Sequence, residues 1–485
     1  MGPMSMADLL PMVPELFLLG SLCVLMIADL FISQAHRAVT HWLSIAVLLL
    51  TAVLVYRVSG DSSLAGSAFG GMFVNDGVAI VCKTFILIST ALVFVYAKPY
   101  LIPRKLFQGE FYTLILFAAL GMMLLSSAGN MLTAYLGLEL LALPSYALVA
   151  LDRDNGKASE AAMKYFVLGA LASGMLLYGI SMMYGATGSL DFGSIRAALL
   201  SNAPHPWLTV FGLVFMVIGI AFKFGAAPFH MWVPDVYEGA PTAVTMFIGS
   251  ASKIGSLALA YRILQDALAP LFMDWQGMLA VLALLSLAIG NLVALAQTNL
   301  KRMLAYSAIS HVGFLLLGLI AGTTEGYASA LFYVITDALT ATASFGLIVF
   351  MSRSGFEAEE IDDFRGLNQR NSWYALLVLL IMASLAGVPL FVGFLAKLQV
   401  LKAAVTAGML WLAIAAGVFT VIGAFYYLRV IKIVYFDEPV AGTTLSAPKD
   451  LPFRLVLSLN ALALVGLGIF GGPLMRWCIR VVAEA

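Results

Sequence analysis

Runs of about twenty apolar residues recur from one end of this 485-residue sequence to the other. A run of that length, folded as an α-helix, matches the hydrocarbon thickness of a lipid bilayer. The composition agrees, because 62% of the residues are hydrophobic and only 11% are charged, whereas soluble domains carry about 25% charged residues. The sequence therefore predicts an all-α polytopic membrane protein.

Charged residues and clusters of proline and glycine separate the apolar runs and so set the number of spans. They predict about fourteen transmembrane helices, near residues 9–31, 41–59, 73–97, 110–128, 130–151, 159–185, 207–238, 241–264, 275–297, 301–322, 326–352, 372–406, 408–436 and 454–480. The first basic residue is Arg37, so the positive segment that opens a cleaved signal peptide is missing. We therefore expect the first run to be a true span.

Lysine and arginine are unevenly distributed between alternate loops. Fifteen lie on one side of the predicted membrane, six lie on the other, and five lysines lie inside spans. Because basic residues accumulate in cytoplasmic loops, the richer side is predicted to be cytoplasmic. Both termini are then predicted to be periplasmic.

Ionisable side chains inside the predicted spans are the candidate functional groups. They are the lysines Lys83, Lys164, Lys223, Lys253 and Lys397 and the acids Asp76, Glu139, Glu160 and Asp337. Each unpaired charge at the centre of a membrane helix costs roughly 3 kcal/mol. We expect such groups to be paired, hydrated in an internal cavity or able to lose their charge, and all three describe a proton or ion path.

Two of these groups lie deepest. Lys253 is about 16 Å from either end of its span, too far to extend its ammonium to water. Glu139 is similarly central in the fifth span. Both are candidates for a proton path, and a buried structural ion pair is the alternative.

Spacing suggests two local pairs. Asp76 and Lys83 are seven residues apart and so lie on one helix face. Glu160 and Lys164 are four residues apart, the ordinary spacing of a helical ion pair. A structural and a functional role both remain open for these pairs.

Lys223 and Lys397 differ because each lies beside a predicted helix break. Pro228 follows Lys223, and the Gly387-Val-Pro389 turn precedes Lys397. Proline removes a backbone donor, so both spans are expected to be broken near mid-membrane. A proline kink without function is the alternative at either site.

The breaks fall in the seventh and twelfth spans, five helices apart. A five-helix unit reverses its orientation when it repeats, as in many transporters. The sequence therefore predicts two inverted five-helix repeats, each with a broken helix. The predicted divisions are a three-helix segment at 1–107, repeats at 108–264 and 265–436, and a C-terminal helix at 437–485.

His311 is the remaining titratable group of interest, about 15 Å into the tenth span. An imidazole can pass protons near neutral pH, and a purely hydrogen-bonding histidine is the alternative. Segment 353–371 is acidic and predicts a short cytoplasmic surface helix, either as a solvated connector or as a docking site for a partner subunit.

Several function classes lack support. The net charge of zero gives no argument for nucleic acid binding. Cys23, Cys82 and Cys478 form no Cys-x-x-Cys pair, no histidine pair has zinc-ligand spacing, and no phosphate-binding glycine loop is present. We therefore expect no redox centre, metal or nucleotide in this chain, so its transport must be driven from outside it.

The run Phe222-Lys-Phe-Gly-Ala-Ala-Pro-Phe-His-Met-Trp-Val-Pro-Asp-Val-Tyr-Glu-Gly-Ala-Pro-Thr242, followed by Ser250-Ala-Ser-Lys253, resembles the antiporter-like subunits of respiratory complex I, the bacterial NADH-quinone oxidoreductase. The resemblance implies that Glu139 and Lys223 form a coupled pair and that Lys253 is a connecting site. It also implies that His311 and Lys397 form the second unit's path. Asp337 is outside the family pattern, and Lys164 and Asp337 are kept as further candidates.

The resemblance also implies partners and a driving reaction. Other membrane subunits would surround this chain in the bacterial inner membrane, and NADH, FMN, iron–sulfur clusters and a quinone would act in other subunits. Proton transport would follow from switching the pairing of Glu139 and Lys223. The alternatives are a cation/proton antiporter subunit of a multi-subunit Mrp-type assembly and a purely structural membrane scaffold.

Overall fold

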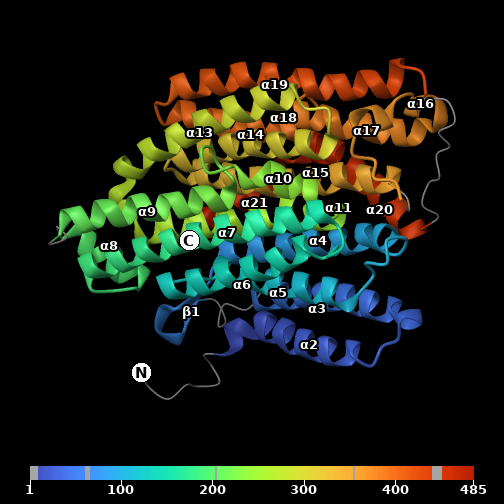
Figure 1. Ribbon diagram of the computed structural model, residues 1–485. Helices are drawn as coiled ribbons and strands as arrows, with labels where there is room; N and C mark the ends of the chain where they lie inside the picture. Colours follow the sequence, from blue (N-terminus) through green and yellow to red (C-terminus); the bar gives the residue numbers. More distant parts are fainter. Residues whose placement is uncertain (1–8, 60–65, 202–204, 353–354, 440–449, 485) are drawn as a thin grey trace.

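The computed structural model describes residues 9–59, 66–201, 205–352, 355–439 and 450–484. Figure 1 shows the helices lying side by side, with the chain progressing from α2 and α3 at one edge to α19 at the other. The left of that view carries the first strand, β1, and α8. Arg353 and Lys449, which entered the loop charge count, lie outside the described residues.

The helices follow the order of the predicted spans. The N-terminal part holds α2 (Val13–Asp29), α3 (Ala38–Ser59), strands β1 (Gly66–Ala68) and β2 (Phe73–Asn75), and α4 (Gly77–Leu101). Next come α5 (Gly109–Ser126), α6 (Met131–Val149), α7 (Gly156–Thr187), α8 (Phe192–Leu200), α9 (Pro206–Phe224), α10 (Trp232–Gly239), α11 (Thr242–Gly249) and α12 (Ala251–Tyr261). The remainder is α13 (Phe272–Leu295), α14 (Leu300–Ile320), α15 (Thr324–Met351), α16 (Leu367–Arg370), α17 (Ser372–Ala386), α18 (Val392–Thr406), α19 (Leu410–Phe436), α20 (Leu451–Phe470) and α21 (Gly472–Ala483).

The described residues contain 13 helical segments long and apolar enough to cross a membrane. The shorter helices α17 and α18 together supply one more crossing, because they are the two halves of the predicted span 372–406. The prediction of an all-α membrane protein with about fourteen spans is confirmed.

Polar caps set where many helices begin. Asn130, Asn299 and Asn371 each accept a hydrogen bond from a backbone N–H in the first turn of the helix that follows. These side chains satisfy donors that have no partner inside the helix. The spans therefore begin at polar positions in the connecting loops.

Glycines allow close contacts between neighbouring spans. A Cβ on Gly121 of α5 would lie 2.8 Å from the carbonyl oxygen of Gly137 in α6, and a Cβ on Gly290 of α13 would lie 2.8 Å from that of Tyr306 in α14. Small residues at such crossings bring helix backbones close together in membrane proteins. Each predicted repeat thus begins with a closely packed helix pair.

Two of the predicted spans differ from the observed helices. Residues 73–75, predicted as the start of a span, form strand β2, which pairs with β1 in an antiparallel hairpin. The predicted span 454–480 is two helices, α20 and α21, that meet at Gly471. Proline at the start of α21 lacks the N–H that a continuous helix would use there.

The acidic segment 353–371 is not a single surface helix. Its described part contains a short 3₁₀ turn at Ile361–Phe364 and the four-residue helix α16. Glu357 is partly buried and accepts hydrogen bonds from Tyr100 and Thr242. At Glu357 the segment therefore contacts α4 and the start of α11, a contact that the run of acidic residues alone did not predict.

Candidate functional site: a line of buried ionisable groups

Lys223 lies in the last turn of α9, immediately before the first break. Gly225, at φ +73°, ends the helix, and the N–H groups of Gly225 and Ala226 donate to the carbonyls of Phe222 and Ala221. Trp232 Nε1 also donates to Phe222 O at 3.0 Å. The break is therefore stabilised without the lysine, whose ammonium has no hydrogen-bond or ion-pair partner among the described residues.

Glu139 of α6 shares a small cavity with Lys223. The cavity, about 20 Å³, is enclosed by α6, α7, α9 and α10 and is lined by Glu139, Ser173 and Lys223 among others. That is roughly the space of one water molecule. Ser173 Oγ donates to the Glu139 carboxylate, and among the described ion pairs Glu139 has no lysine partner. The two residues implied as a coupled pair thus face one cavity while unpaired.

Lys253 lies at the start of α12, just after a kink in the span that the sequence predicted as continuous over 241–264. Ser250, at φ −118° and ψ −88°, separates α11 from α12. Lys253 Nζ lies 2.7 Å from Asp337 Oδ2 of α15, and only 9% and 6% of these side chains are exposed. Lys253 is therefore held in a buried ion pair, as one of the two sequence-based alternatives proposed.

Asp337 also faces His311 of α14. Its second carboxylate oxygen lies 3.4 Å from His311 Nδ1. The same ring nitrogen lies 2.7 Å from the hydroxyl of Tyr333, and Nε2 lies 3.3 Å from that of Tyr427. Asp337 thus bridges Lys253 and His311, although it is outside the family pattern.

The hydrogen-bonded groups continue beyond His311. The hydroxyl of Tyr427 in α19 lies 2.5 Å from Ser307 Oγ, which is about one turn closer to the start of α14 than His311. The start of α14 carries Lys301 and Arg302, on the predicted cytoplasmic side. The chain Ser307, Tyr427, His311 therefore extends from the buried centre toward that side.

Lys397 lies in α18, just after the second break. α17 ends at Ala386, and the N–H groups of Gly387 and Val388 donate to the carbonyls of Ala383 and Ser384. Lys397 Nζ donates to the next two carbonyls, Leu385 O at 2.8 Å and Ala386 O at 3.4 Å. All four terminal carbonyls of α17 are thereby satisfied, and the last two use the lysine.

A second cavity, about 10 Å³, adjoins this break. His311, Asp337 and Leu385 are among the residues that line it. His311 and Asp337 therefore face the same cavity as Leu385, whose backbone carbonyl accepts a hydrogen bond from Lys397.

Lys83 and Asp76 do not pair with each other, contrary to their spacing. Lys83 Nζ lies 2.7 Å from Glu15 Oε1 in α2, and both side chains are almost fully buried. Asp76 caps α4 and pairs with Arg262 at 2.7 Å. Each group found a closer partner on another helix, which helix periodicity alone cannot predict.

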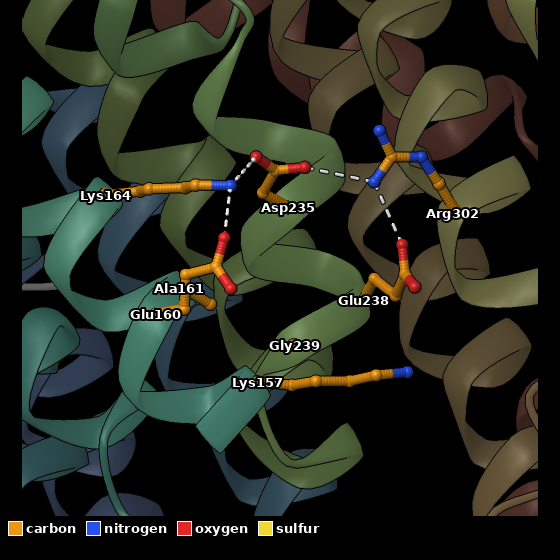
Figure 2. Close-up of a pocket in the computed structure, with 8 residues that line it drawn as sticks. All are labelled: Lys157, Glu160, Ala161, Lys164, Asp235, Glu238, Gly239 and Arg302. Atoms are coloured by element: carbon orange, nitrogen blue, oxygen red, sulfur yellow. Dashed lines mark hydrogen bonds and ion pairs between the residues drawn. The ribbon is translucent and has the colours of Figure 1, made fainter. Parts of the chain in front are cut away.

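Lys164 lies in a partly exposed charged cluster, apart from the ionisable groups beside the two helix breaks (Figure 2). It pairs with Glu160 at 2.9 Å, as the spacing predicted, and with Asp235 at 2.8 Å. Arg302 pairs with Asp235 and Glu238 on the opposite side of the same pocket, whose volume is about 230 Å³. Burial alone would raise the pKa of Asp235, but hydrogen bonds from Lys164 and Arg302 hold that pKa below its ordinary value.

Sequence reasoning missed the hydroxyl groups of the site. Ser173, Tyr333 and Tyr427 contact Glu139 or His311, but serine and tyrosine are frequent in the spans and carry no spacing signal. Within the described part of the chain, no group of three or more His, Cys, Asp or Glu residues is arranged to hold a metal ion.

Comparison with known protein families identifies the class of membrane protein to which this multispan bundle belongs. Residues 128–423 match the family model described as NADH:quinone oxidoreductase/Mrp antiporter, TM. The chain is 54% identical to NADH-quinone oxidoreductase subunit N of Thioalkalivibrio sulfidiphilus, covering 96% of this chain and 97% of the relative. It is also 54% identical to subunit N of Xanthomonas euvesicatoria, covering 100% and 98%. The chain belongs to the NADH-quinone oxidoreductase subunit N family.

Solved structures agree with this assignment. A chain of respiratory complex I from Thermus thermophilus superposes with a TM-score of 0.81 at 31% identity, covering 96% of this chain and 99% of that one. A chain of the Mrp complex from Dietzia sp. superposes with a TM-score of 0.82 at 21% identity, covering 99% and 97%, which shows a shared fold alone.

Proposed function

We propose that this chain is a proton-translocating membrane subunit of NADH-quinone oxidoreductase. It assembles with other membrane subunits in the bacterial inner membrane, and quinone reduction by NADH in other subunits drives it. The family assignment supports the complex, and the buried ionisable groups support the transport. NADH, FMN, iron–sulfur clusters and the quinone act outside this chain, whose own contribution is proton transfer between side chains.

The observation that carries the proposal is the presence of buried or partly buried ionisable groups in both predicted repeats. Glu139 and Lys223 face one cavity, Asp337 contacts both Lys253 and His311, and His311 and Asp337 line a second cavity beside the break that Lys397 stabilises. Each group can hold or release a proton. All of them except Lys397 lie in helices long and apolar enough to cross a membrane, and Lys397 lies in α18, the second half of the predicted span 372–406. We infer that together they form a proton relay from Glu139 to Lys397.

The pairing of Glu139 and Lys223 controls the first step. A carboxylate next to the ammonium stabilises its charged form, whereas separation leaves that charge in a poorly hydrated site. The structure holds the separated arrangement, with Ser173 hydrogen-bonded to Glu139. Formation of the Glu139–Lys223 pair would load Lys223 with a proton, and its opening would release that proton toward Lys253.

The energies involved are compatible with this switch. Moving one charge against 100 mV requires about 2.3 kcal/mol. A change of about two units in the pKa of a group corresponds to a similar free energy, at 1.36 kcal/mol per unit. A single ion pair that opens and closes in a desolvated site is therefore sufficient in magnitude.

The membrane orientation is part of the proposal. Both termini are periplasmic, which agrees with the loop charge count and with an even number of crossings. The start of α14, where the Ser307–Tyr427–His311 chain leads, is then cytoplasmic. Two inverted repeats, each containing one broken span, would place the two lysines on the two halves of the path.

The test uses Lys223→Met and Glu139→Gln in the assembled complex. Quinone reduction by NADH and proton uptake are measured separately, with Lys402→Met as control because that lysine is 65% exposed. We expect each site variant to lower proton translocation by about tenfold or more, with the control unchanged. Full pumping by the double variant would exclude this mechanism.

The second candidate function is a sodium/proton antiporter subunit, and the fold shared with the Mrp complex is the observation that favours it. Sodium-dependent proton movement in membranes that lack NADH would support it. The names of the curated relatives favour the redox complex.

A further inference from the structure

Helix α20 packs against both halves of the second broken span, α17 and α18. At the start of α17, Trp373 Nε1 donates to Ser458 Oγ of α20 at 3.0 Å, and Arg454 Nε donates to the Tyr374 hydroxyl at 3.0 Å. Further along, α20 reaches the loop that joins α17 to α18. One helix therefore contacts the broken span at its beginning and at its break.

The contact at the break depends on Gly468. A Cβ at this position would lie 2.6 Å from the carbonyl carbon of Phe391 and 2.7 Å from that of Leu390, and closer still to the Leu390 oxygen. Backbone atoms cannot move aside as a flexible side chain can. Only glycine allows α20 to approach the Leu390–Phe391 peptide so closely.

Leu390 has a backbone that needs such support. Its φ is +81°, in the left-handed region that a leucine rarely adopts. Leu390 is 69% exposed, so burial of its side chain does not hold the conformation. A strained backbone conformation persists only where neighbouring atoms hold it in place. At Leu390 the backbone of α20 provides those neighbouring atoms.

α20 also contacts the other side of the break. A Cβ on Gly471 would lie 2.7 Å from Leu395 Cδ2, in the first turn of α18 and two residues before Lys397. The two glycines, three residues apart, therefore lie on one face of the helix end and touch the loop and the start of α18.

We propose that Gly468 is a positioning residue for Lys397. Gly468 allows α20 to pack directly against the Leu390–Phe391 peptide, which fixes the conformation of the loop. In that conformation the Leu385 and Ala386 carbonyls point at the lysine ammonium. This inference rests on the proposed function, because it assigns Gly468 a role through a relay lysine. Gly468 itself touches no proton-carrying group.

The test compares Gly468→Ala with Gly466→Ala. Both add one methyl group to the same helix, but a Cβ on Gly466 meets nothing within 4 Å. We expect Gly468→Ala to lower the rate of proton translocation per assembled complex by about tenfold. We expect Gly466→Ala to leave that rate unchanged.

A rescue separates positioning from a general packing defect. In Gly468→Ala/Leu390→Gly, glycine at 390 carries a positive φ without strain, so the peptide can yield to the added methyl. We expect the double variant to recover at least half of the lost pumping, whereas a packing defect elsewhere along α20 would not respond to residue 390. Equal pumping by the two alanine variants, or no recovery in the double variant, would overturn the assignment.

A Lys397 variant measured in parallel distinguishes this inference from the proposed function. If Lys397→Met abolishes pumping while Gly468→Ala pumps normally, the positioning role fails and the relay stands. If Lys397→Met pumps normally, the relay fails and the positioning role fails with it.

Discussion

Lys253 Nζ lies 2.7 Å from Asp337 Oδ2, and this buried ion pair joins α12 of the first predicted repeat to α15 of the second. Asp337 reaches His311 with its other oxygen. The pair therefore links the two predicted repeats, at the point where the proposed relay would pass from one to the other. The carboxylate at this junction could not be assigned from the family pattern, and only the contact identifies its partner.

The first prediction separates the structural role of this pair from its role in transport. Asp337→Asn leaves the Lys253 charge unpaired in a buried site, at a cost of about 3–5 kcal/mol. We expect a reduced amount of this subunit in the assembled complex and a loss of pumping. Lys253→Met/Asp337→Asn removes both charges, so we expect assembly to recover while pumping stays low.

Subunit content and proton uptake in membrane vesicles check this prediction. Recovery of both quantities in the double variant would reduce the pair to a structural element.

The second prediction concerns the charge state of Lys397. Arginine keeps the positive charge and offers several donors to the Leu385 and Ala386 carbonyls, but it does not release its proton. We expect Lys397→Arg to preserve assembly and to lower proton translocation by about tenfold or more. Lys397→Met should lose both the carbonyl contacts and the transport.

Quinone reduction and proton uptake in the same preparation are the measurements. Normal pumping by the arginine variant would mean that Lys397 only stabilises the break between α17 and α18.

The third prediction uses two neighbouring tyrosines of α19. Tyr427 contacts His311 and Ser307, whereas Tyr426 donates to Asn291 and does not contact His311. Tyr427→Phe removes the hydroxyl between Ser307 and the histidine, so we expect pumping to fall several-fold. Tyr426→Phe loses one hydrogen bond of about 1 kcal/mol, so we expect a small loss of stability and normal pumping.

Proton uptake per assembled complex distinguishes the two variants. An equal effect of both would indicate general packing of α19 rather than a proton path through Tyr427.

The fourth prediction concerns Glu357, which lies outside the spans. Burial alone would raise its pKa, but the charges of Lys301 and Arg104 and the hydrogen bonds from Thr242 and Tyr100 hold that pKa below its ordinary value. Because the folded-state pKa is depressed, the resulting stability is present above the unfolded value, about 4.3, and is lost as the pH falls through the folded value.

We therefore expect Glu357→Gln to lower the thermal stability of the subunit at pH 7, by about 1–3 kcal/mol. The difference from the unaltered chain should shrink below about pH 4.3. Melting of the complex followed at several pH values checks this, with Glu325→Gln as control because Glu325 is 62% exposed. A difference that does not vary with pH would contradict the assignment.

The positions of the two broken spans could be predicted from the sequence. Pro228 and the Gly387-Val-Pro389 turn predicted interruptions beside Lys223 and Lys397, and both interruptions are present. The sequence also shows that Lys223 precedes its break and Lys397 follows its own, and the structure adds what each lysine contacts. As a result, only Lys397 satisfies helix-terminal carbonyls, and Lys223 remains free to face Glu139.

The interruption at Ser250 escaped prediction because a single glycine, Gly249, precedes it and no proline lies beside it. Its backbone angles depend on how α11 and α12 pack against α4 and α15. The partners of the buried charges escaped for a related reason, since Lys83 pairs with Glu15 and Asp76 pairs with Arg262, each on a distant helix.

By itself, the sequence determined that this chain crosses a membrane about fourteen times and which ionisable groups it carries into the bilayer, because both follow from local hydrophobicity and helix length. Apart from the local Glu160–Lys164 pair, only the tertiary structure decided which charges meet. Ion pairs and carbonyl contacts form between helices far apart in the chain, and their geometry depends on packing at separations that no periodicity encodes. The same holds for Gly468, whose position beside Leu390 exists only when α20 lies against the break.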